Sequence, residues 1–280
     1  MIRTRAGHPV RGTMTDHDVP EEGQVAGNRP RNLTFGSVAE RYERFRPGYP
    51  ETLRELVLAG TRPEAALEVG AGTGKATRLF AGNGLAVTAV EPDAQMCAVL
   101  ARTTASLPVT VVCSTLEALP PQPPVGLVYA AAAWHWTDPA TRWARAARLL
   151  VPDGVFASFG GPLNLTDENL RARVEDERAK VIGDEDVPGT EDQPGDALRW
   201  PGNELAASPY FADVEEHDLT TIDRMAADDL VGLLSTVSAY LLLDEPVRAA
   251  LLRRIRSLLP DTVEVRRELT LHRARRTHHR

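Results

Sequence analysis

The sequence predicts an α/β fold in which a mostly parallel sheet has helices on both faces. Two observations predict it. Short apolar runs recur along the chain with helix-like stretches between them, and the first of these runs leads into a turn in which every second residue is glycine. Strands that alternate with helices pair in parallel, because each crossover lays a helix on one face of the sheet.

Seven strands are expected from the apolar runs. They are Ala65–Val69, Leu85–Val90, Val109–Val112, Val125–Ala130, Val155–Phe159, Ala212–Ile222 and Thr262–Leu271. The helix-like stretches include Leu53–Ala59, Glu168–Ile182, Asp228–Leu243 and Pro246–Leu259. In open sheets of this kind, ligands bind at the carboxyl ends of the strands, so the polar and glycine-rich segments there are the candidate site.

The two polar segments of the chain are interpreted as accessory. Residues 1–33 lack hydrophobic period and are predicted to be a disordered N-terminal extension, within which Met14 is an alternative start. An acidic run after the fifth strand is predicted to be a solvated loop; its acids are Asp184, Glu185, Asp186, Glu191, Asp192 and Asp196.

Composition narrows the class of protein. With 280 residues and 42% hydrophobic content the chain can bury a large core, and a net charge of −7 argues against nucleic acid as the main partner. No apolar run is long enough to cross a bilayer. Cys97 and Cys113 are the only cysteines, which suggests a reducing compartment and no disulfide framework. These features predict a cytoplasmic protein.

The basic C-terminal stretch is interpreted as a structural element. Its arginines are Arg266, Arg267, Arg273, Arg275, Arg276 and Arg280. Apolar alternation around them favours a half-exposed last strand followed by a frayed tail over a nucleic-acid patch. His278 and His279 are terminal and lack other ligands nearby in sequence, so no metal site is expected.

The glycine turn is the strongest single motif. Gly70, Gly72 and Gly74 let the backbone turn sharply and approach a ligand closely. Lys75 stands where a dinucleotide fingerprint has its third glycine, and Glu68 before the turn would repel a pyrophosphate but suit an ammonium group. Glu91, at the end of the next strand, can accept both hydroxyls of a ribose. The alternative is a tight turn with a solvated glutamate.

Four motifs in order carry a family resemblance. Residues 67–74 and 89–93 resemble the first two motifs of the class I S-adenosylmethionine-dependent methyltransferases. Residues 35–50 are similar to the entry segment of the small-molecule branch that includes trans-aconitate methyltransferase-like proteins, and residues 114–120 and 133–136 resemble its third and fourth motifs. Together they cover roughly residues 35–160.

The resemblance implies a Rossmann-like sheet whose last strand is antiparallel. It also implies a lid at 34–50, a cofactor-binding core at 51–160, a helical substrate-cover insertion at 161–208 and a C-terminal part at 209–280. S-adenosylmethionine is the implied cofactor and a small molecule the implied substrate, while a homodimer is left open. The implied cofactor-binding residues are Tyr42, Arg46, Glu68, Gly70, Gly72, Thr73, Gly74, Glu91, Pro92, Met96, Thr115, Leu116, Glu117, Ala132, Ala133 and Trp134.

Several of these residues have two interpretations. His135, between Trp134 and Trp136, is either part of an aromatic wall against the adenosine or a general base, and it is the one catalytic candidate. Arg46 either pairs with the cofactor carboxylate or caps a helix end. Met96 either packs beneath the adenine or lies in the core.

Thr115 departs from the family pattern. Many members have an acid there that binds the adenine amino group, so either Thr115 or Glu117 takes that role here. The whole sequence predicts methyl transfer from S-adenosylmethionine to an O, N or C atom of a small metabolite by in-line displacement, with secondary metabolism as one setting. The alternatives are an enzyme of the same fold that catalyses a cyclisation or rearrangement, and a non-enzymatic cofactor-binding or scaffold protein.

Overall fold

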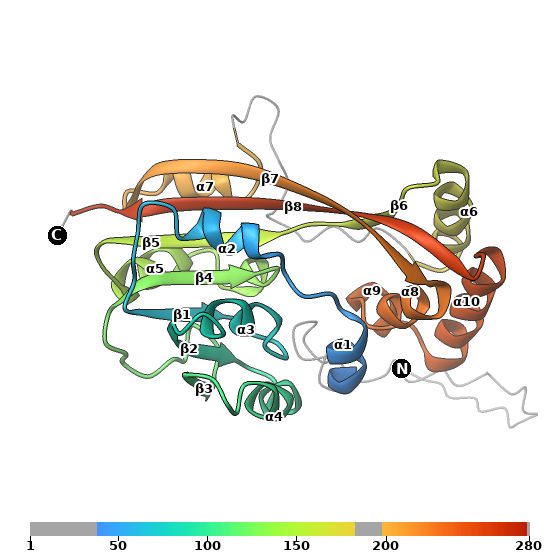
Figure 1. Ribbon diagram of the computed structural model, residues 1–280, viewed down its shortest axis with the longest axis horizontal. Coiled ribbons are helices and arrows are strands. Elements are labelled where there is room, and N and C mark those ends of the chain that lie inside the picture. Colours follow the sequence, from blue (N-terminus) through green and yellow to red (C-terminus); the bar gives the residue numbers. More distant parts are fainter. Residues whose placement is uncertain (1–37, 183–197, 279–280) are drawn as a thin grey trace, which may run out of the picture.

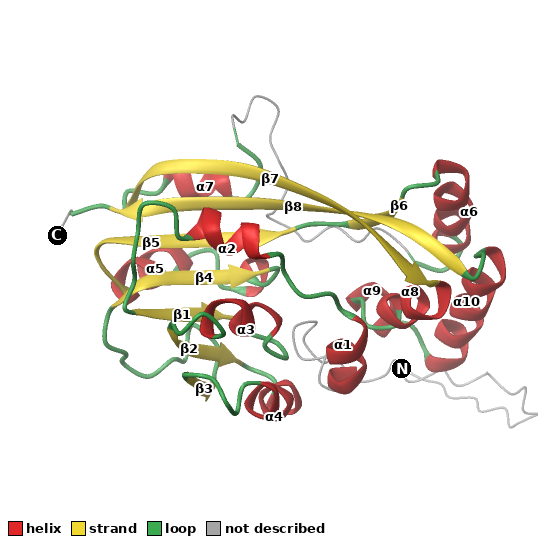
Figure 2. Ribbon diagram, viewed as in Figure 1, coloured by secondary structure: helices red, strands yellow, loops and turns green. Residues whose placement is uncertain are grey.

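A mixed sheet of eight strands runs through the molecule in the computed structural model, which describes residues 38–182 and 198–278 (Figure 1, Figure 2). The strands are β1 (Ala65–Val69), β2 (Ala86–Glu91), β3 (Val109–Cys113), β4 (Val125–Ala131), β5 (Leu150–Gly160), β6 (Leu163–Leu165), β7 (Phe211–Ala226) and β8 (Thr262–Arg276). Their order is β3-β2-β1-β4-β5-β8-β6, and β7 pairs with β8.

Strand directions confirm the predicted fold class. Strands β1 to β5 are parallel, and β8 is antiparallel to β5 and to β7. Strand β6 was not expected. It pairs with β8 beyond the point where the pairing of β5 with β8 ends. Gly161 separates β5 from β6 with φ +157°, and a Cβ there would lie 1.8 Å from the Glu268 carbonyl oxygen on β8. The close backbone approach therefore interrupts one long strand.

Helices cover both faces of the sheet, as predicted. The helices are α1 (Ala39–Phe45), α2 (Glu51–Val57), α3 (Lys75–Ala81), α4 (Ala94–Thr103), α5 (Arg142–Leu149), α6 (Glu168–Ala179), α7 (Gly202–Ala207), α8 (Ala227–Leu234), α9 (Ser238–Leu241) and α10 (Glu245–Leu258). One core includes Leu53, Phe80 and Leu100 of α2, α3 and α4. The other includes Ala146 of α5 and Leu205 of α7. Alternate strand residues fill these two cores because successive side chains point to opposite faces.

A third core lies at the far end of the long strands. Helices α6, α8 and α10 gather there around the start of β8, well away from β1 to β3 (Figure 1). Helix α1 lies between this helical layer and the parallel part of the sheet and contacts both α4 and α8 (Figure 1). Its position makes α1 a bridge between the two halves of the molecule.

The helix expected over 228–243 is two helices. The hydroxyl of Ser235 donates to the Gly232 carbonyl at 2.6 Å, and that of Thr236 donates to the Leu233 carbonyl at 2.6 Å. Such local bonds compete with helical hydrogen bonds, and Val237 is extended with ψ 137°. The chain thus turns between α8 and α9.

The prediction of a frayed C-terminal tail is wrong. Strand β8 extends to Arg276, and His272 and Arg273 are buried. The neighbouring strands β5 and β7 lie on either side of it, and Arg273 donates to the Ala59 carbonyl at 2.7 Å. Arginines that bind backbone carbonyls hold this end in the sheet. The predicted disordered extension at 1–33 and the acidic loop residues 184–196 lie outside the described residues.

Candidate active site

A cavity of about 260 Å³ lies at the carboxyl ends of the parallel strands. Its wall combines the glycine turn, the end of β2, the segments after β3 and β4, and two segments from other parts of the fold. The lining residues are Tyr42, Arg46, Val69, Gly70, Gly72, Val90, Glu91, Pro92, Met96, Ser114, Thr115, Leu116, Glu117, Ala131, Ala132, Ala133, His135, Trp136, Thr137, Val237 and Ser238. The four sequence motifs therefore meet at one place, as the topology of parallel sheets requires.

The glycine turn needs glycine for two reasons. Gly70, Gly72 and Gly74 have φ values of +69°, +57° and +90°, a region that disfavours side chains. A Cβ on Gly70 would lie 2.4 Å from the Ala133 Cβ, so the bare backbone of the turn packs directly against the Ala133 side chain. Gly74 faces away from the cavity, where a Cβ would lie 2.8 Å from Leu100. Close packing thus shapes this part of the wall.

Glu91 presents a buried carboxylate to the cavity. One oxygen accepts from the Gly72 N–H at 2.8 Å and the other from the Asp93 N–H at 3.0 Å. Burial raises the pKa of Glu91, while the two N–H groups oppose that rise. Each oxygen keeps a further lone pair, so the carboxylate can still accept hydroxyl donors.

Glu68 has a different place from the one expected. It is not among the lining residues; it lies beneath the turn, 1% exposed. One carboxylate oxygen accepts from the hydroxyls of Thr77 at 2.6 Å and Tyr129 at 3.0 Å. Burial raises the pKa of Glu68 to about 8, so it is mostly protonated at neutral pH. The structure places it as a neutral core group and not on the cavity wall.

Three other expected residues also lie behind the wall. Thr73 is fully buried. Gly74 is the N-cap of α3 and packs against α4. Trp134 is 1% exposed and packs on Trp143 and Phe156, with ring centroids 5.1 and 4.6 Å apart. These residues support the cavity from the core.

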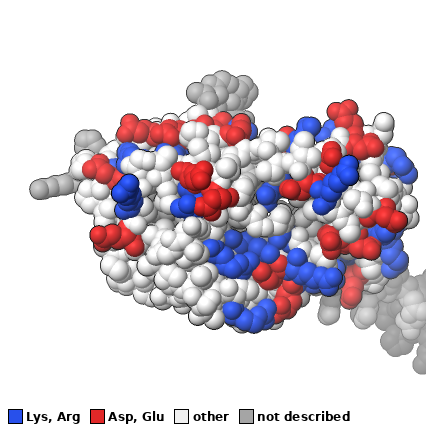
Figure 3. Space-filling model, in the orientation of Figure 1, with Lys and Arg blue, Asp and Glu red and all other residues white. Residues whose placement is uncertain are grey.

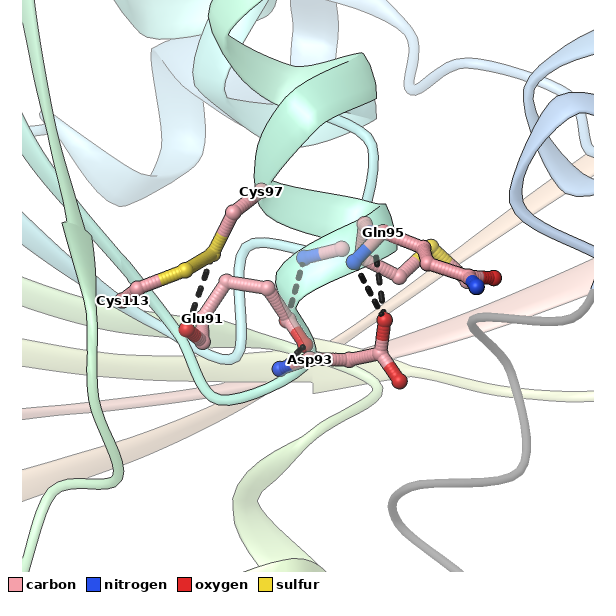
Figure 4. The surroundings of a disulfide bond; sticks show 7 residues. Glu91, Asp93, Gln95, Cys97 and Cys113 are labelled. Atoms are coloured by element: carbon pink, nitrogen blue, oxygen red, sulfur yellow. Dashed lines mark hydrogen bonds between the residues drawn. A yellow bond between two sulfur atoms is a disulfide. The ribbon is translucent and has the colours of Figure 1, made fainter.

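The adenosine side expected from the motifs is formed by the start of α4 and the segment after β3. Asp93 caps α4 by accepting from the N–H groups of Gln95 and Met96 at 2.8 and 3.1 Å (Figure 4). Met96 is 2% exposed and lines the cavity, where it also packs with Ala39 of α1. Met96 is thus buried in a small core and also borders the cavity, and its place beneath an adenine stays a prediction.

A disulfide joins Cys97 on α4 to Cys113 at the end of β3 (Figure 4). The prediction that these cysteines form no disulfide framework is wrong. Spacing alone did not reveal the pair, because the two cysteines are 16 positions apart and the chain between them returns through a helix and a strand. The Cys97 sulfur lies 3.1 Å from the Glu91 carbonyl oxygen. The bond therefore ties together two segments, 92–96 and 114–117, that line the cavity.

The two candidates for reading an adenine are both on the wall. The Thr115 hydroxyl accepts from the Ala118 N–H at 3.2 Å, and a Glu117 carboxylate oxygen accepts from the Asp138 N–H at 2.9 Å. Each has a local structural role, and each keeps free acceptor capacity. Ser114 also lines the cavity. The geometry leaves both Thr115 and Glu117 available.

His135 lines the cavity from a single 3-10 turn, Trp134–Trp136. Its ring lies 4.5 Å from the ring of Trp136 and 6.5 Å from that of Trp200. Burial, and then the nearby charge of Arg142, lower the pKa of His135 to about 4. The imidazole is therefore neutral at physiological pH and has a free nitrogen to accept a proton, though it is a weak base.

Arg46 enters the cavity from the end of α1. Its Nε donates to the Thr236 hydroxyl at 3.0 Å and its Nη2 to the Thr236 carbonyl at 3.2 Å. The guanidinium carbon also lies 5.2 Å from the centre of the Tyr42 ring. Among the described residues that line the cavity, Arg46 is the one with a permanent positive charge. It does more than cap a helix.

Ion pairs join α1 to helices α3 and α4. Glu43 pairs with Arg78 at 2.8 Å, and Glu40 pairs with Arg102 at 2.7 Å.

On the face drawn in Figure 3, acidic and basic side chains lie interspersed over much of the surface. Within the ranges 38–182 and 198–278, no group of three or more His, Cys, Asp or Glu side chains could hold a metal ion. No described helix is long and apolar enough to span a bilayer.

Sequence reasoning missed the wall that the C-terminal helices supply. Val237 and Ser238 line the cavity, and Thr236 holds Arg46 from behind. No described residue of the 161–208 segment lines the cavity; α6 packs on α10, and α7 on β7. The signal that was available is the run Ser235-Thr236-Val237-Ser238, a polar break within an otherwise helical pattern.

Comparison with known proteins agrees with this geometry. Residues 67–158 match the model of a methyltransferase domain. An uncharacterised methyltransferase of Mycobacterium tuberculosis strain H37Rv is 34% identical over 238 residues, which are 84% of this chain and 89% of the relative. The chain belongs to the class I S-adenosylmethionine-dependent methyltransferases. It is an enzyme of that family, and S-adenosylmethionine is its cofactor.

Solved structures share the methyltransferase's fold. A protein of Anaeromyxobacter dehalogenans assigned as a type II methyltransferase is 25% identical, with a TM-score of 0.59; the match covers 82% of this chain and 98% of that one. A protein of Bacillus halodurans assigned as a methyltransferase is 17% identical with a TM-score of 0.50, covering 82% and 100%. The second likeness shows the fold alone.

Proposed function

We propose that this methyltransferase transfers the methyl group of S-adenosylmethionine to an O, N or C atom of a small metabolite by in-line displacement, with secondary metabolism as one setting. The observation that carries the proposal is the meeting of four motifs and one cation around a single cavity. The cofactor supplies an activated methyl on a sulfonium. The protein's task is then to align the accepting atom and exclude water.

The residues present suit the cofactor. The Glu91 carboxylate, held by two backbone N–H groups, is placed to accept ribose hydroxyls. Gly70 and Gly72 leave the wall free of side chains, and Met96 provides an apolar surface for a purine. Arg46 offers a cation for the carboxylate of the methionine part. Thr115 or Glu117 would read the adenine amino group.

The neutral form of His135 suits a general base when the accepting atom carries a proton. A carboxylate substrate would need no base, and His135 would then pack against the ligand. With a pKa of about 4, a base role predicts a rate that is constant from about pH 6 to 8 and falls only as His135 becomes protonated in more acidic solution.

The test follows the methyl group. The enzyme is supplied with cofactor carrying a deuterated methyl and with pools of small metabolites, and mass spectrometry follows both S-adenosylhomocysteine and the labelled product. We expect a product heavier by the label. A converted product without label would instead establish cyclisation or rearrangement.

A second measurement separates the roles of His135. His135→Ala should lower kcat about 100-fold or more if the imidazole is the base, while affinity for S-adenosylhomocysteine stays within about twofold. His217→Ala on β7 is the matched control, since His217 contacts Glu215 and is not among the lining residues. Equal losses in kcat and cofactor affinity would establish a packing role for His135.

We propose a cytoplasmic location for the enzyme. A cytoplasmic enzyme fits a diffusible cofactor and substrate. Because Cys97 and Cys113 form a disulfide, the two cysteines do not indicate a reducing compartment.

A further inference from the structure

The contact between Arg46 and Thr236 joins residues 190 positions apart in the chain. Thr236 is fully buried in the turn between α8 and α9, and it meets the guanidinium with two acceptors, its hydroxyl and its carbonyl. The Thr236 hydroxyl in turn donates to the Leu233 carbonyl at 2.6 Å, which fixes its lone pairs toward Arg46. The acceptor is therefore preorganised.

These contacts use part of the guanidinium and leave the rest for a ligand. A guanidinium has five N–H donors, and Thr236 takes two of them. Tyr42 lies against the guanidinium as well, with 5.2 Å from its ring centre to the guanidinium carbon. An arginine held in this way loses little side-chain freedom when an anion binds.

We propose that Thr236 is a positioning residue that orients Arg46 toward the carboxylate of the bound amino-acid moiety. The inference rests on the proposed function and adds to it a residue far from all four sequence motifs. A carboxylate at Arg46 could come from the cofactor or from a substrate. The cofactor is favoured because Arg46 and the glycine turn line one cavity, and Gly72 lies against Tyr42, with the Tyr42 ring 3.9 Å from a Cβ placed on Gly72.

Two matched ligands test the proposal by calorimetry on the full chain. One is S-adenosylhomocysteine, and the other is its decarboxylated analogue, S-adenosyl-3-thiopropylamine, which keeps the adenosine and the amine. Thr236→Val keeps the branched shape and the backbone carbonyl but removes the hydroxyl acceptor. We expect Thr236→Val to weaken binding of S-adenosylhomocysteine about 5- to 20-fold and to change binding of the analogue less than twofold.

Two further variants guard against a purely structural effect. Thr236→Ser keeps the acceptor and should restore affinity to within about twofold of the wild type. Thr104→Val removes a buried hydroxyl that likewise donates to a backbone carbonyl, that of Leu100 at 2.7 Å, without touching an arginine. It should leave the ratio of the two affinities unchanged.

The outcomes divide cleanly. Equal weakening of both ligands in Thr236→Val, or unchanged affinity for S-adenosylhomocysteine, would overturn the positioning role while leaving the methyltransferase assignment intact. In the second case a rise in KM for the acceptor identified with the deuterated methyl group would assign Arg46 to a substrate anion. Failure of the wild type to bind S-adenosylhomocysteine would instead contradict the proposed cofactor site itself.

Discussion

Two walls of the cavity differ in how they are built. One consists of the glycine turn, the end of β2 and residues 114–117, and contacts between neighbouring strands and turns hold it together. The other consists of Arg46, Val237 and Ser238, and it joins segments 190 residues apart. We name them the motif wall and the helical wall. In the motif wall, the Gly72 N–H group holds the Glu91 carboxylate, and the Cys97–Cys113 disulfide joins two of the segments. The helical wall depends on single side chains such as Thr236. We propose that the motif wall holds the adenosine part of the cofactor, whereas the helical wall orients the Arg46 cation toward the carboxylate of its methionine part.

The largest expected effect concerns the bond that holds the motif wall together. Cys97→Ser combined with Cys113→Ser should lower the free energy of unfolding by about 3 kcal/mol, since the bond closes a loop of this length in the unfolded chain. Denaturant unfolding with and without reductant measures it. The wild type should lose stability on reduction and the variant should not. A wild type that shows two free thiols without reductant, and no response to it, would remove the disulfide from the account.

The next effect concerns Glu91. Glu91→Ala should weaken binding of S-adenosylhomocysteine by about 1–3 kcal/mol, because the hydroxyl acceptor is lost and the Gly72 N–H is left without its partner. Calorimetry reports the affinity, and circular dichroism checks that the fold is kept. Unchanged affinity would show that the motif wall does not bind the ribose and that the comparison of the two walls is mistaken.

A smaller effect separates the two buried carboxyls. With a pKa of about 8 against an ordinary 4.5, Glu68 stays protonated in the folded chain while the unfolded chain ionises, so stability falls as pH rises through that window. Glu68→Gln removes this dependence, so its stability relative to the wild type should rise by about 1 kcal/mol between pH 6 and pH 7. Its affinity for S-adenosylhomocysteine should not change. Weaker binding would show that Glu68 reaches the ligand after all.

The parts that the sequence predicted are those set by local pattern. The run Ala65–Val69 matches β1, because a buried parallel strand leaves a nearly continuous apolar signature, which only Glu68 breaks here. The glycine turn and Glu91 were found because turn geometry and strand ends are encoded by neighbours in the chain. The fold class followed from the alternation of these elements.

The parts that the sequence did not reveal depend on contacts between distant segments. Glu68 was expected to meet an ammonium group beside the glycine turn, yet hydrogen bonds from Thr77 and Tyr129 hold it in the core. The Cys97–Cys113 pair and the Arg46–Thr236 contact arise only when the chain is folded. Residue patterns carry little information about such pairings.

The most direct test of the account is a crystal structure of the enzyme with S-adenosylhomocysteine bound. We predict that the ligand fills this cavity, with its ribose hydroxyls on the Glu91 carboxylate and its own carboxylate at Arg46, while Glu68 stays beneath the glycine turn. A ligand bound elsewhere, or bound here with its ribose away from Glu91, would contradict the account.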